Sequence, residues 1–469
     1  MNGYSEVLDT IAAVSTPRGK GGIAVIRISG PQAADIAGRV FISKSGKKLT
    51  ERPRSAFYGE IREPIENGSL IDTGLAVFFP GPGSFTGEDT VEISCHGGVL
   101  VTSAVLRAAL NAGARQAEAG EFTRRSFASG KMSLPEAEAL GLLLDAGTEN
   151  QLRLSRAGLS GTLAGRCAGL RDSITGLLTD IYARIDFPEE DLGSIPDGEI
   201  AERLAQIRQE TERLCGTYRT GRAVAEGIDT VICGRTNAGK STLFNLMTGS
   251  DDAIVTDIEG TTRDILTSVV SFGGATLRLC DTAGIRGETD DKVEAIGIGR
   301  ANKKIDSAEL VLFLIDGSRR PDDQDTGLAQ RLLNHPGQVI AVMTKTDLPK
   351  NAEADVLFSR FENRVTVSAR TPDGIGALER LVADMFIDGQ LDIGTDPVVS
   401  SARQYTALCE ALSGIDAAID AMNSGFAHDV VSVCLEDAAA AFAGLDGRGF
   451  GAVSADVIDG IFSKFCVGK

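Results

Sequence analysis

Hydrophobic and polar positions follow three patterns along the chain. In the first pattern, at residues 9–127, short β-rich runs alternate with glycine and proline turns, and one helical run follows Gly98. A period of two residues predicts strands, whereas recurrence every three to four residues predicts helices. This part is therefore predicted to be a small α+β domain, with strands at 11–15, 23–29, 74–80 and 90–95 and a helix at 99–113.

The other two patterns are interleaved. Apolar residues recur at helical spacing in residues 131–222 and again in residues 396–469. Between them, residues 227–386 alternate β-rich and helical runs, which is typical of a doubly wound parallel sheet. The patterns predict that an α/β domain is inserted into a helical one. The expected domains are 1–130, then a helical domain formed by 131–226 and 387–469, and the inserted domain 227–386.

The composition is that of a globular protein. The 469 residues suffice for about three domains, and 42% are hydrophobic and 24% charged. The longest apolar runs are much shorter than the roughly 18 residues that a membrane-spanning helix requires. The first ten residues, MNGYSEVLDT, lack the basic start and apolar core of a secretory signal. We therefore expect a cytoplasmic protein without a membrane span.

The net charge of -18 is unevenly distributed. Residues 1–130 hold 14 Lys and Arg against 13 Asp and Glu, whereas residues 387–469 hold 4 against 12. This excess of acidic groups argues against strong, unaided binding of a polyanion such as a nucleic acid. A nucleic-acid-binding role would therefore require a partner that supplies positive surface.

A glycine-rich segment, GRTNAGKS at 234–241, follows a predicted strand and precedes a predicted helix. In a phosphate-binding loop of this kind, backbone N–H groups and a helix N-terminus hold the phosphates. Lys240 would pair with the β- and γ-phosphate oxygens, and the Ser241 hydroxyl would bind Mg²⁺. The alternative is a purely structural glycine turn, and it is disfavoured because four further GTPase segments follow in the right order.

These further segments supply the other parts of a GTPase site. Thr262 would give magnesium a second hydroxyl, Asp281 would hold the metal's water shell, and the Gly284 N–H would meet the γ-phosphate. Asp347 would accept from the N1–H and 2-amino groups of guanine, which selects GTP over ATP. Thr344 stands where GTPases usually have asparagine, so one hydrogen bond to the base or the loop is weakened or supplied by its hydroxyl.

The group that positions the attacking water is not obvious. Ile285 follows Gly284 where Ras-like enzymes have a glutamine, and no arginine finger is evident. A downstream acidic run offers carboxylates, although any one of them is more often a solvated surface residue. The candidates are Glu288, Asp290, Asp291 and Glu294.

The sequence resembles the MnmE family, also called TrmE, of bacterial and organellar tRNA-modification GTPases. The resemblance extends through all three parts of the chain, and independent convergence on so many segments is implausible. The segments that carry it are TPRGKGGIAVIRISG (16–30), FPGPGSFTGEDTVEISCHGG (79–98), GEFTRRSFASGK (120–131), IDFPEED (185–191), GRTNAGKS (234–241), AIVTDIEGTTRD (253–264), DTAGIR (281–286), VEAIGIGRA (293–301) and FCVGK (465–469).

The resemblance implies a complete functional scheme. It implies an N-terminal folate-binding and dimerisation domain, a split helical domain and an inserted Ras-like G domain. A homodimeric, K⁺-activated GTPase would form a heterotetramer with an MnmG-like FAD protein. It would modify C5 of the wobble uridine (U34) of tRNA with a one-carbon unit from 5-formyl- or methylene-tetrahydrofolate. The alternative is a regulatory switch GTPase in ribosome assembly.

The resemblance also assigns the nucleotide and metal sites. Glu294 is implied as the water-orienting acid, and Ser241 and Thr262 as Mg²⁺ ligands. Potassium would be bound by Asn237 with oxygens of Thr256, Ile258 and Thr261. The full set of expected GTP-binding residues is Asn237, Ala238, Gly239, Lys240, Ser241, Thr242, Thr256, Asp257, Ile258, Glu259, Gly260, Thr261, Thr262, Asp281, Thr282, Ala283, Gly284, Thr344, Lys345, Thr346, Asp347, Ser368, Ala369 and Arg370.

A second candidate site lies in the N-terminal part. Arg27 and Glu92 each fall inside an apolar strand pattern, where an unpaired charge would be costly. Either a polar ligand or a mutual ion pair explains them, and the resemblance favours folate, adding Lys131 and Lys469. The eight scattered cysteines predict reduced, mostly buried thiols. In the terminal FCVGK, however, the resemblance implies that Cys466 is a functional thiol beside the folate.

Overall fold

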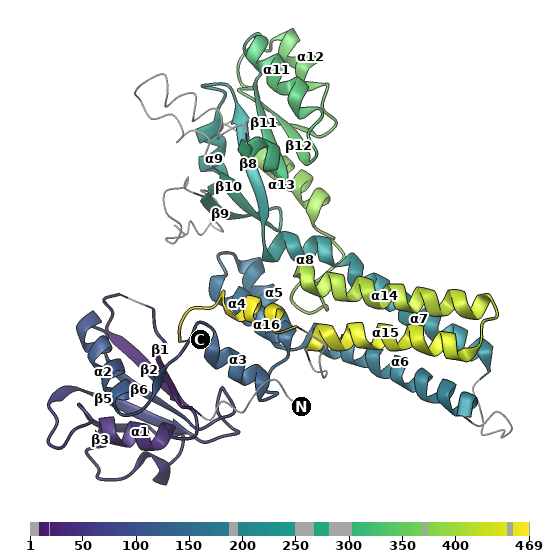
Figure 1. Cartoon of the computed structure of the whole chain (residues 1–469). Coiled ribbons are helices and arrows are strands. Elements are labelled where there is room, and N and C mark those ends of the chain that lie inside the picture. The colour runs from purple at the N-terminus through teal and green to yellow at the C-terminus, as the bar shows by residue number, and fades with distance from the viewer. Residues whose placement is uncertain are drawn as a thin grey trace. The chain divides into compact units, whose positions relative to one another are not determined.

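The chain forms two compact units in a computed structural model (Figure 1). Unit 1 comprises residues 1–141 and 446–469, and unit 2 comprises residues 142–445. The structure describes residues 9–17, 19–186, 196–248, 267–280, 303–368, 373–447 and 454–468. Among these residues, no helix combines the length and the apolar character that crossing a membrane requires.

Unit 1 is built on a seven-stranded sheet in the order β3-β4-β5-β6-β2-β1-β7. Pairing is antiparallel except between β1 and β7. Alternate side chains along each strand point to one face of the sheet. On this face, Ile26 of β2 and Ile93 of β6 pack with Ile36 of α1 and Val105 of α2. The elements are β1 (Ile11–Val14), β2 (Ile23–Ser29), α1 (Ala33–Val40), β3 (Phe41–Ser43), β4 (Phe57–Arg62), β5 (Leu70–Phe79), β6 (Thr90–His96), α2 (Val99–Asn111), β7 (Arg115–Gln116) and α3 (Glu121–Ala128).

The last part of the chain completes unit 1. Helix α16 (Ala455–Phe462) supplies Ile458 and Phe462, which pack with Leu134 at the start of α4 (Leu134–Asp145) and with Phe127. Val467 forms an antiparallel bridge with Ala119. Residues far apart in sequence therefore share one small core.

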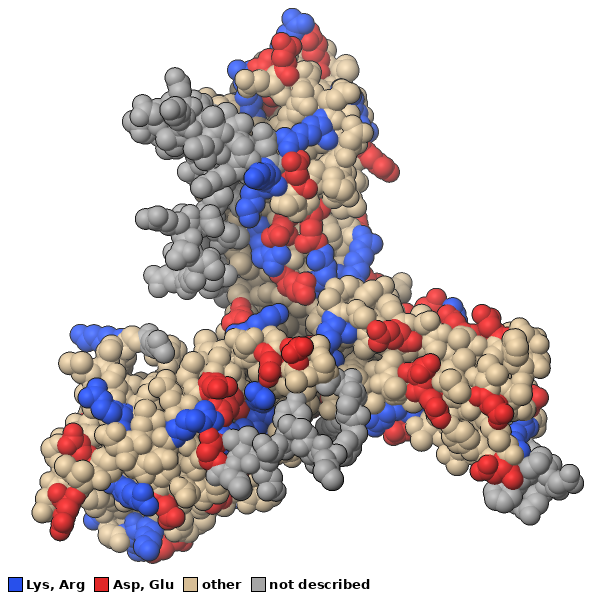
Figure 2. Space-filling model, in the orientation of Figure 1, with Lys and Arg blue, Asp and Glu red and all other residues tan. Residues whose placement is uncertain are grey.

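The helices of unit 2 form a bundle in which α6, α7, α14 and α15 lie side by side (Figure 1). Their buried residues recur at helical spacing, as Ile174, Leu177 and Ile181 do in α6. Acidic side chains predominate on the face of the bundle shown in Figure 2. The helices are α5 (Glu149–Leu159), α6 (Thr162–Asp186), α7 (Asp197–Gly216), α8 (Tyr218–Ala225), α14 (Ala402–Asn423) and α15 (His428–Asp446).

The α/β part of unit 2 contains a six-stranded sheet in the order β13-β12-β11-β8-β10-β9. All pairs are parallel except β9 with β10 at the edge. Helices on both faces bury every residue of the central strand β11. The elements are β8 (Ile228–Gly234), α9 (Lys240–Thr248), β9 (Thr267–Phe272), β10 (Ala275–Cys280), β11 (Leu310–Asp316), α11 (Asp323–Leu332), β12 (Gln338–Thr344), α12 (Ala352–Phe358), β13 (Arg364–Thr366) and α13 (Asp373–Phe386).

The predicted fold class is confirmed: an N-terminal α+β part, helices, and a doubly wound sheet of the kind found in G domains. The sequence pattern did not indicate β9, which makes the edge of the sheet antiparallel. A two-glycine turn, Gly273–Gly274, joins β9 to β10, with φ of 60° and 83°. Such values fit the tight turns that match the twist of paired strands.

Candidate nucleotide-binding site

The phosphate-loop sequence lies between β8 and α9, as its motif requires. Gly234 has a φ of 140°, and a Cβ there would lie 2.6 Å from the carbonyl oxygen of Leu314, so no larger residue fits. The Lys240 ammonium donates to the carbonyl oxygens of Gly234 (2.9 Å) and Arg235 (2.8 Å). Asn237 is exposed, with a φ of 63°. The lysine therefore lies along the inner side of a tightly turned loop.

The predicted base-side residues lie beside this loop. The Thr344 hydroxyl at the end of β12 is 2.8 Å from the carbonyl oxygen of Ala238. Beyond it, the Ser368 hydroxyl donates to a carboxylate oxygen of Asp347 at 3.2 Å. In open α/β sheets, ligands bind at the edge formed by the carboxyl ends of the strands. The parallel strands β8, β11 and β12 end at this edge. The structure thus brings the loop and the predicted base-reading segment together.

Asp316 is a further residue of this site that no sequence motif indicated. It ends β11, is 7% exposed, and accepts from the Lys345 ammonium at 2.7 Å. Burial alone would raise the pKa of Asp316, but hydrogen bonds from Lys345 and Ser318 outweigh it and lower the pKa. The ionised carboxylate fixes Lys345 next to Asp347. The signal that could have found it is an aspartate ending the apolar run LVLFLID.

The other expected nucleotide residues divide into two groups. Ser241 and Thr242 are exposed in the first turn of α9, and Thr346 lies half-buried between Lys345 and Asp347. Gly239 has a φ of 97°. The remainder lie outside the described residues: Thr256, Asp257, Ile258, Glu259, Gly260, Thr261, Thr262, Asp281, Thr282, Ala283, Gly284, Glu294, Ala369 and Arg370.

In unit 1, Arg27 and Glu92 face each other across the paired strands β2 and β6. The Arg27 guanidinium donates to one Glu92 carboxylate oxygen from Nε (3.0 Å) and Nη2 (2.8 Å). Its centre also lies 5.2 Å from the ring centroid of Phe85 and 5.6 Å from that of Phe122. The mutual ion pair is therefore present. Glu92 keeps 31% of its side chain exposed, so the pair can still be reached by a ligand.

The other two described residues of the expected folate set contact different groups. The Lys131 ammonium donates to the carbonyl oxygen of Pro82 at 2.7 Å. Cys466 is exposed. Burial instead raises the pKa of the Cys233 thiol to about 12 and that of Cys95 to about 11, which keeps both protonated. Lys469 lies outside the described residues.

A buried ion-pair network beside this pair was not anticipated from the sequence. The Arg125 guanidinium, 9% exposed, donates to Asp9 (2.7 Å), Glu121 (2.9 Å) and Glu88 (3.1 Å). Burial would raise the pKa values of Asp9 and Glu121, but hydrogen bonds from Arg115 and Arg125 lower them. Glu88 follows Phe85 by three residues, so the network anchors the loop that carries this ring over Arg27.

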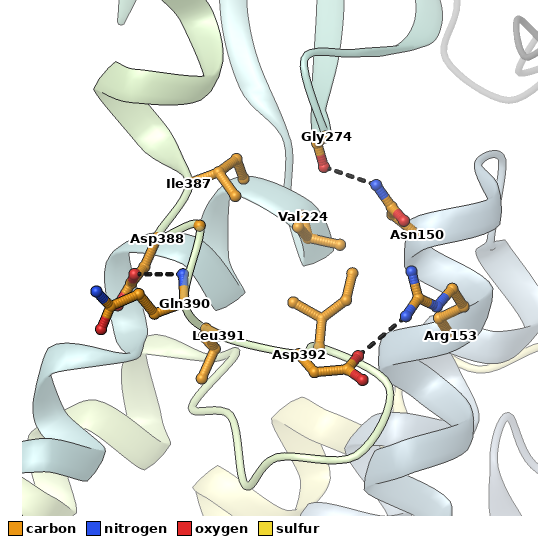
Figure 3. Close-up of a pocket in the computed structure, with 11 residues that line it drawn as sticks. Asn150, Arg153, Val224, Gly274, Ile387, Asp388, Gln390, Leu391 and Asp392 are labelled. Atoms are coloured by element: carbon orange, nitrogen blue, oxygen red, sulfur yellow. Dashed lines mark hydrogen bonds and ion pairs between the residues drawn. The ribbon is translucent and has the colours of Figure 1, made fainter. Parts of the chain in front are cut away.

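Unit 2 also contains a cavity of about 390 Å³ where its sheet meets its helices (Figure 3). The Asn150 amide of α5 donates to the carbonyl oxygen of Gly274, in the β9–β10 turn, at 2.9 Å. Arg153 pairs with Asp392 of the connecting segment at 2.9 Å. Val224 contributes to the apolar wall. These contacts fix the far end of the hairpin, away from the nucleotide site.

Two family models match the chain. The model described as the GTP-binding protein TrmE N-terminus matches residues 10–131, and the MnmE helical domain matches residues 134–466. The tRNA modification GTPase MnmE of Acetivibrio thermocellus is 37% identical over 463 residues, covering 98% of this chain and 99% of that protein. That of Clostridioides difficile is 36% identical over 464 residues, covering 98% and 99%.

Among solved structures, Era from Aquifex aeolicus, bound to GDP and AlF₄⁻, is 20% identical with a TM-score of 0.27. The match covers 40% of this chain and 66% of that one. The family models and the curated relatives together extend from the N-terminal sheet to the last helix. The chain therefore belongs to the MnmE family of tRNA modification GTPases.

Proposed function

We propose that the protein is a potassium-activated GTPase that modifies C5 of the wobble uridine of tRNA, with a flavin-dependent partner and a tetrahydrofolate one-carbon unit. Its family membership makes it a GTP hydrolase acting in tRNA modification. The observation that carries the GTPase part of the proposal is the convergence of Lys240, Thr344 and Asp347 at the carboxyl ends of the parallel strands. A ribosome-assembly switch is not retained, because the family match extends through the N-terminal and helical parts.

The proposed division of labour follows three domains. Residues 1–130 would bind folate and form the homodimer, 131–226 with 387–469 would form the helical domain, and 227–386 would hydrolyse GTP. The acidic bundle, with exposed Glu410 and Asp420 on α14, is a poor surface for tRNA. The flavin-dependent partner would therefore supply much of the positive surface that holds the tRNA.

Two described residues support the cations that the proposal requires. Ser241 and Thr262 would hold Mg²⁺, which when bound neutralises charge on the β- and γ-phosphate oxygens. Asn237 would hold K⁺ with oxygens of Thr256, Ile258 and Thr261, the ligands that the family resemblance implies. Described members of both sets, Ser241 and Asn237, are exposed around the loop and offer oxygen ligands, which suit hard cations. Glu294 would orient the attacking water.

The cation assignment predicts a specific dependence on potassium. GTP turnover by the full chain should be at least about tenfold faster in KCl than in NaCl at equal ionic strength, because the ion neutralises charge that an arginine finger would otherwise meet. Asn237→Ala should lose this difference yet still bind GDP, and Glu294→Ala should bind GTP but turn it over slowly. Equal rates in the two salts would remove the role of Asn237.

The folate assignment is tested by binding. The full chain should bind 5-formyltetrahydrofolate in equilibrium dialysis, and Arg27→Ala or deletion of residues 466–469 should weaken binding by about tenfold or more. Each removes a charged or hydrogen-bonding group proposed to touch the ligand. Lys350→Ala, an exposed change in unit 2, is the matched control. Absence of binding to the full chain would refute the folate-dependent part of the proposal.

A further inference from the structure

The threonine that ends β12 occupies a position where GTPases usually have asparagine, and its hydroxyl is turned into the protein. Thr344 is 7% exposed. Its Oγ1 lies 2.8 Å from the carbonyl oxygen of Ala238 in the phosphate loop and 3.3 Å from that of Ile315 in β11. The side chain thus connects the ends of β11 and β12 to the predicted phosphate loop.

The chemistry of these partners limits what Thr344 can do for the base. A hydroxyl has one proton, and both partners are carbonyl oxygens, which only accept. The proton is therefore used within the protein whichever carbonyl receives it. The edge of guanine that Asp347 does not read carries N7 and O6, which also only accept. Thr344 has no donor left for that edge.

Packing supports a role of Thr344 toward the loop. A Cβ placed on Gly239 would lie 3.6 Å from the Thr344 methyl group and 3.8 Å from its hydroxyl oxygen. The threonine side chain therefore lies against the loop backbone just before Lys240. An asparagine carries one acceptor and two donors, so it can hold the loop and donate to a base at the same time. A threonine can do only the first.

We propose that Thr344 is a positioning residue that holds the phosphate loop against β12 and makes no hydrogen bond to the base. Guanine is then recognised on the edge that Asp347 reads, the N1–H and 2-amino groups, and Thr344 gives N7 no hydrogen bond. The inference rests on the proposed contact between Asp347 and guanine. It concerns this chain's departure from asparagine.

The test compares three nucleotides bound by the full chain in isothermal titration calorimetry. GDP is the reference, 7-deaza-GDP replaces N7 by a C–H group, and IDP lacks the 2-amino group. The chain should bind GDP and 7-deaza-GDP within about twofold of each other and bind IDP at least about tenfold more weakly, since only the Asp347 contact is lost. Thr344→Asn should instead prefer GDP to 7-deaza-GDP by about fivefold.

A preference of the unaltered chain for GDP over 7-deaza-GDP by fivefold or more would overturn the proposal, as would equal binding of GDP and IDP. Failure to bind any of the three would overturn the proposed GTPase function instead.

Two further variants test the loop-holding role. Thr344→Val keeps the shape and removes the hydroxyl, so it should weaken all three nucleotides by the same factor, about tenfold. Thr344→Ser keeps the hydroxyl and should restore affinity to within about threefold of the unaltered chain. Normal binding by Thr344→Val would overturn the positioning role. The comparison of GDP with 7-deaza-GDP needs no variant, so it decides the base-contact claim even if Thr344→Val fails to fold.

Discussion

At the scale of single residues, the nucleotide site depends on how buried polar groups are satisfied. Asp316 is buried, yet it stays ionised because Lys345 and Ser318 donate to it. Thr344 is buried and uses its one proton on a backbone carbonyl. In both cases, the side chain fixes a neighbour that would contact the nucleotide, so each acts on the ligand through another residue.

The lowered pKa of Asp316 predicts a pH-dependent effect. Asp316→Asn should reduce the free energy of unfolding by about 2 kcal/mol at pH 7, since the amide that replaces the carboxylate carries no charge to pair with the Lys345 ammonium. A carboxylate whose pKa is lowered by folding stabilises fully above its ordinary value, 3.8; this stabilisation decreases as the pH falls below 3.8 and is gone below the lowered pKa of the folded state. The difference in the free energy of unfolding between the unaltered chain and Asp316→Asn should therefore be smaller at pH 3.5 than at pH 7.

Urea unfolding at the two pH values measures this difference. Asp384→Asn, an exposed carboxylate on α13, is the control and should change stability by less than about 0.5 kcal/mol. A cost of Asp316→Asn that is the same at pH 7 and pH 3.5 would contradict an ionised role for this side chain.

At the scale of secondary-structure elements, α16 is held by aromatic packing. Phe462 is 2% exposed, with its ring centroid 6.1 Å from that of Phe127 and 6.0 Å from that of Phe465. Phe462→Ala should destabilise this core by about 3 kcal/mol or more, because removing a buried ring leaves a cavity. Hydrogen exchange should become faster in α3 and α16, whereas β11 and β12 of unit 2 should be unaffected.

Phe426→Ala is the matched control, because this ring is 61% exposed and should be removable with little effect. Unchanged exchange in α3 of the Phe462→Ala variant would show that α16 is not required for this core.

Elements with strong local patterns could be predicted from the sequence, and those that depend on distant partners could not. The apolar runs that became β8, β11 and β12 and the helical spacing of α6 and α14 were confirmed. Strand β9 was not predicted because its pairing is specified by the hairpin turn at Gly273. Helix α3 was not predicted because its charged residues, such as Arg125, form ion pairs with Asp9 and Glu88 from distant segments. A one-dimensional pattern counts such charges as exposed.

The candidate site divides in the same way. Motif spacing predicted Lys240, Asp347 and Ser368, which the structure places at the carboxyl ends of parallel strands in one sheet. The partner of Lys345, Asp316, was missed because it is more than twenty residues away in sequence and belongs to no motif. Such support becomes visible only when parallel strands align their ends.

At the scale of the whole molecule, the chain is organised so that its first and last parts belong to the same unit. Residues 446–469 return to the unit begun by residues 1–141, with all of unit 2 between them. The backbone carbonyl of Gly468 accepts from the Ser15 hydroxyl at 3.0 Å. The exposed Cys466 is thereby tied to the unit that contains the Arg27–Glu92 pair.

This arrangement has a consequence for synthesis on the ribosome. The small core around Phe127 and Leu134 lacks its α16 residues until every residue of the second unit has been translated. Contacts that close so long a loop form slowly and late. A chain released before α16 is made would therefore lack Cys466 and would expose the apolar surface of Phe127 and Leu134. Proteases and chaperones act on chains that expose such surfaces. The fold thus completes this core of the first-translated unit only once α16 has been translated.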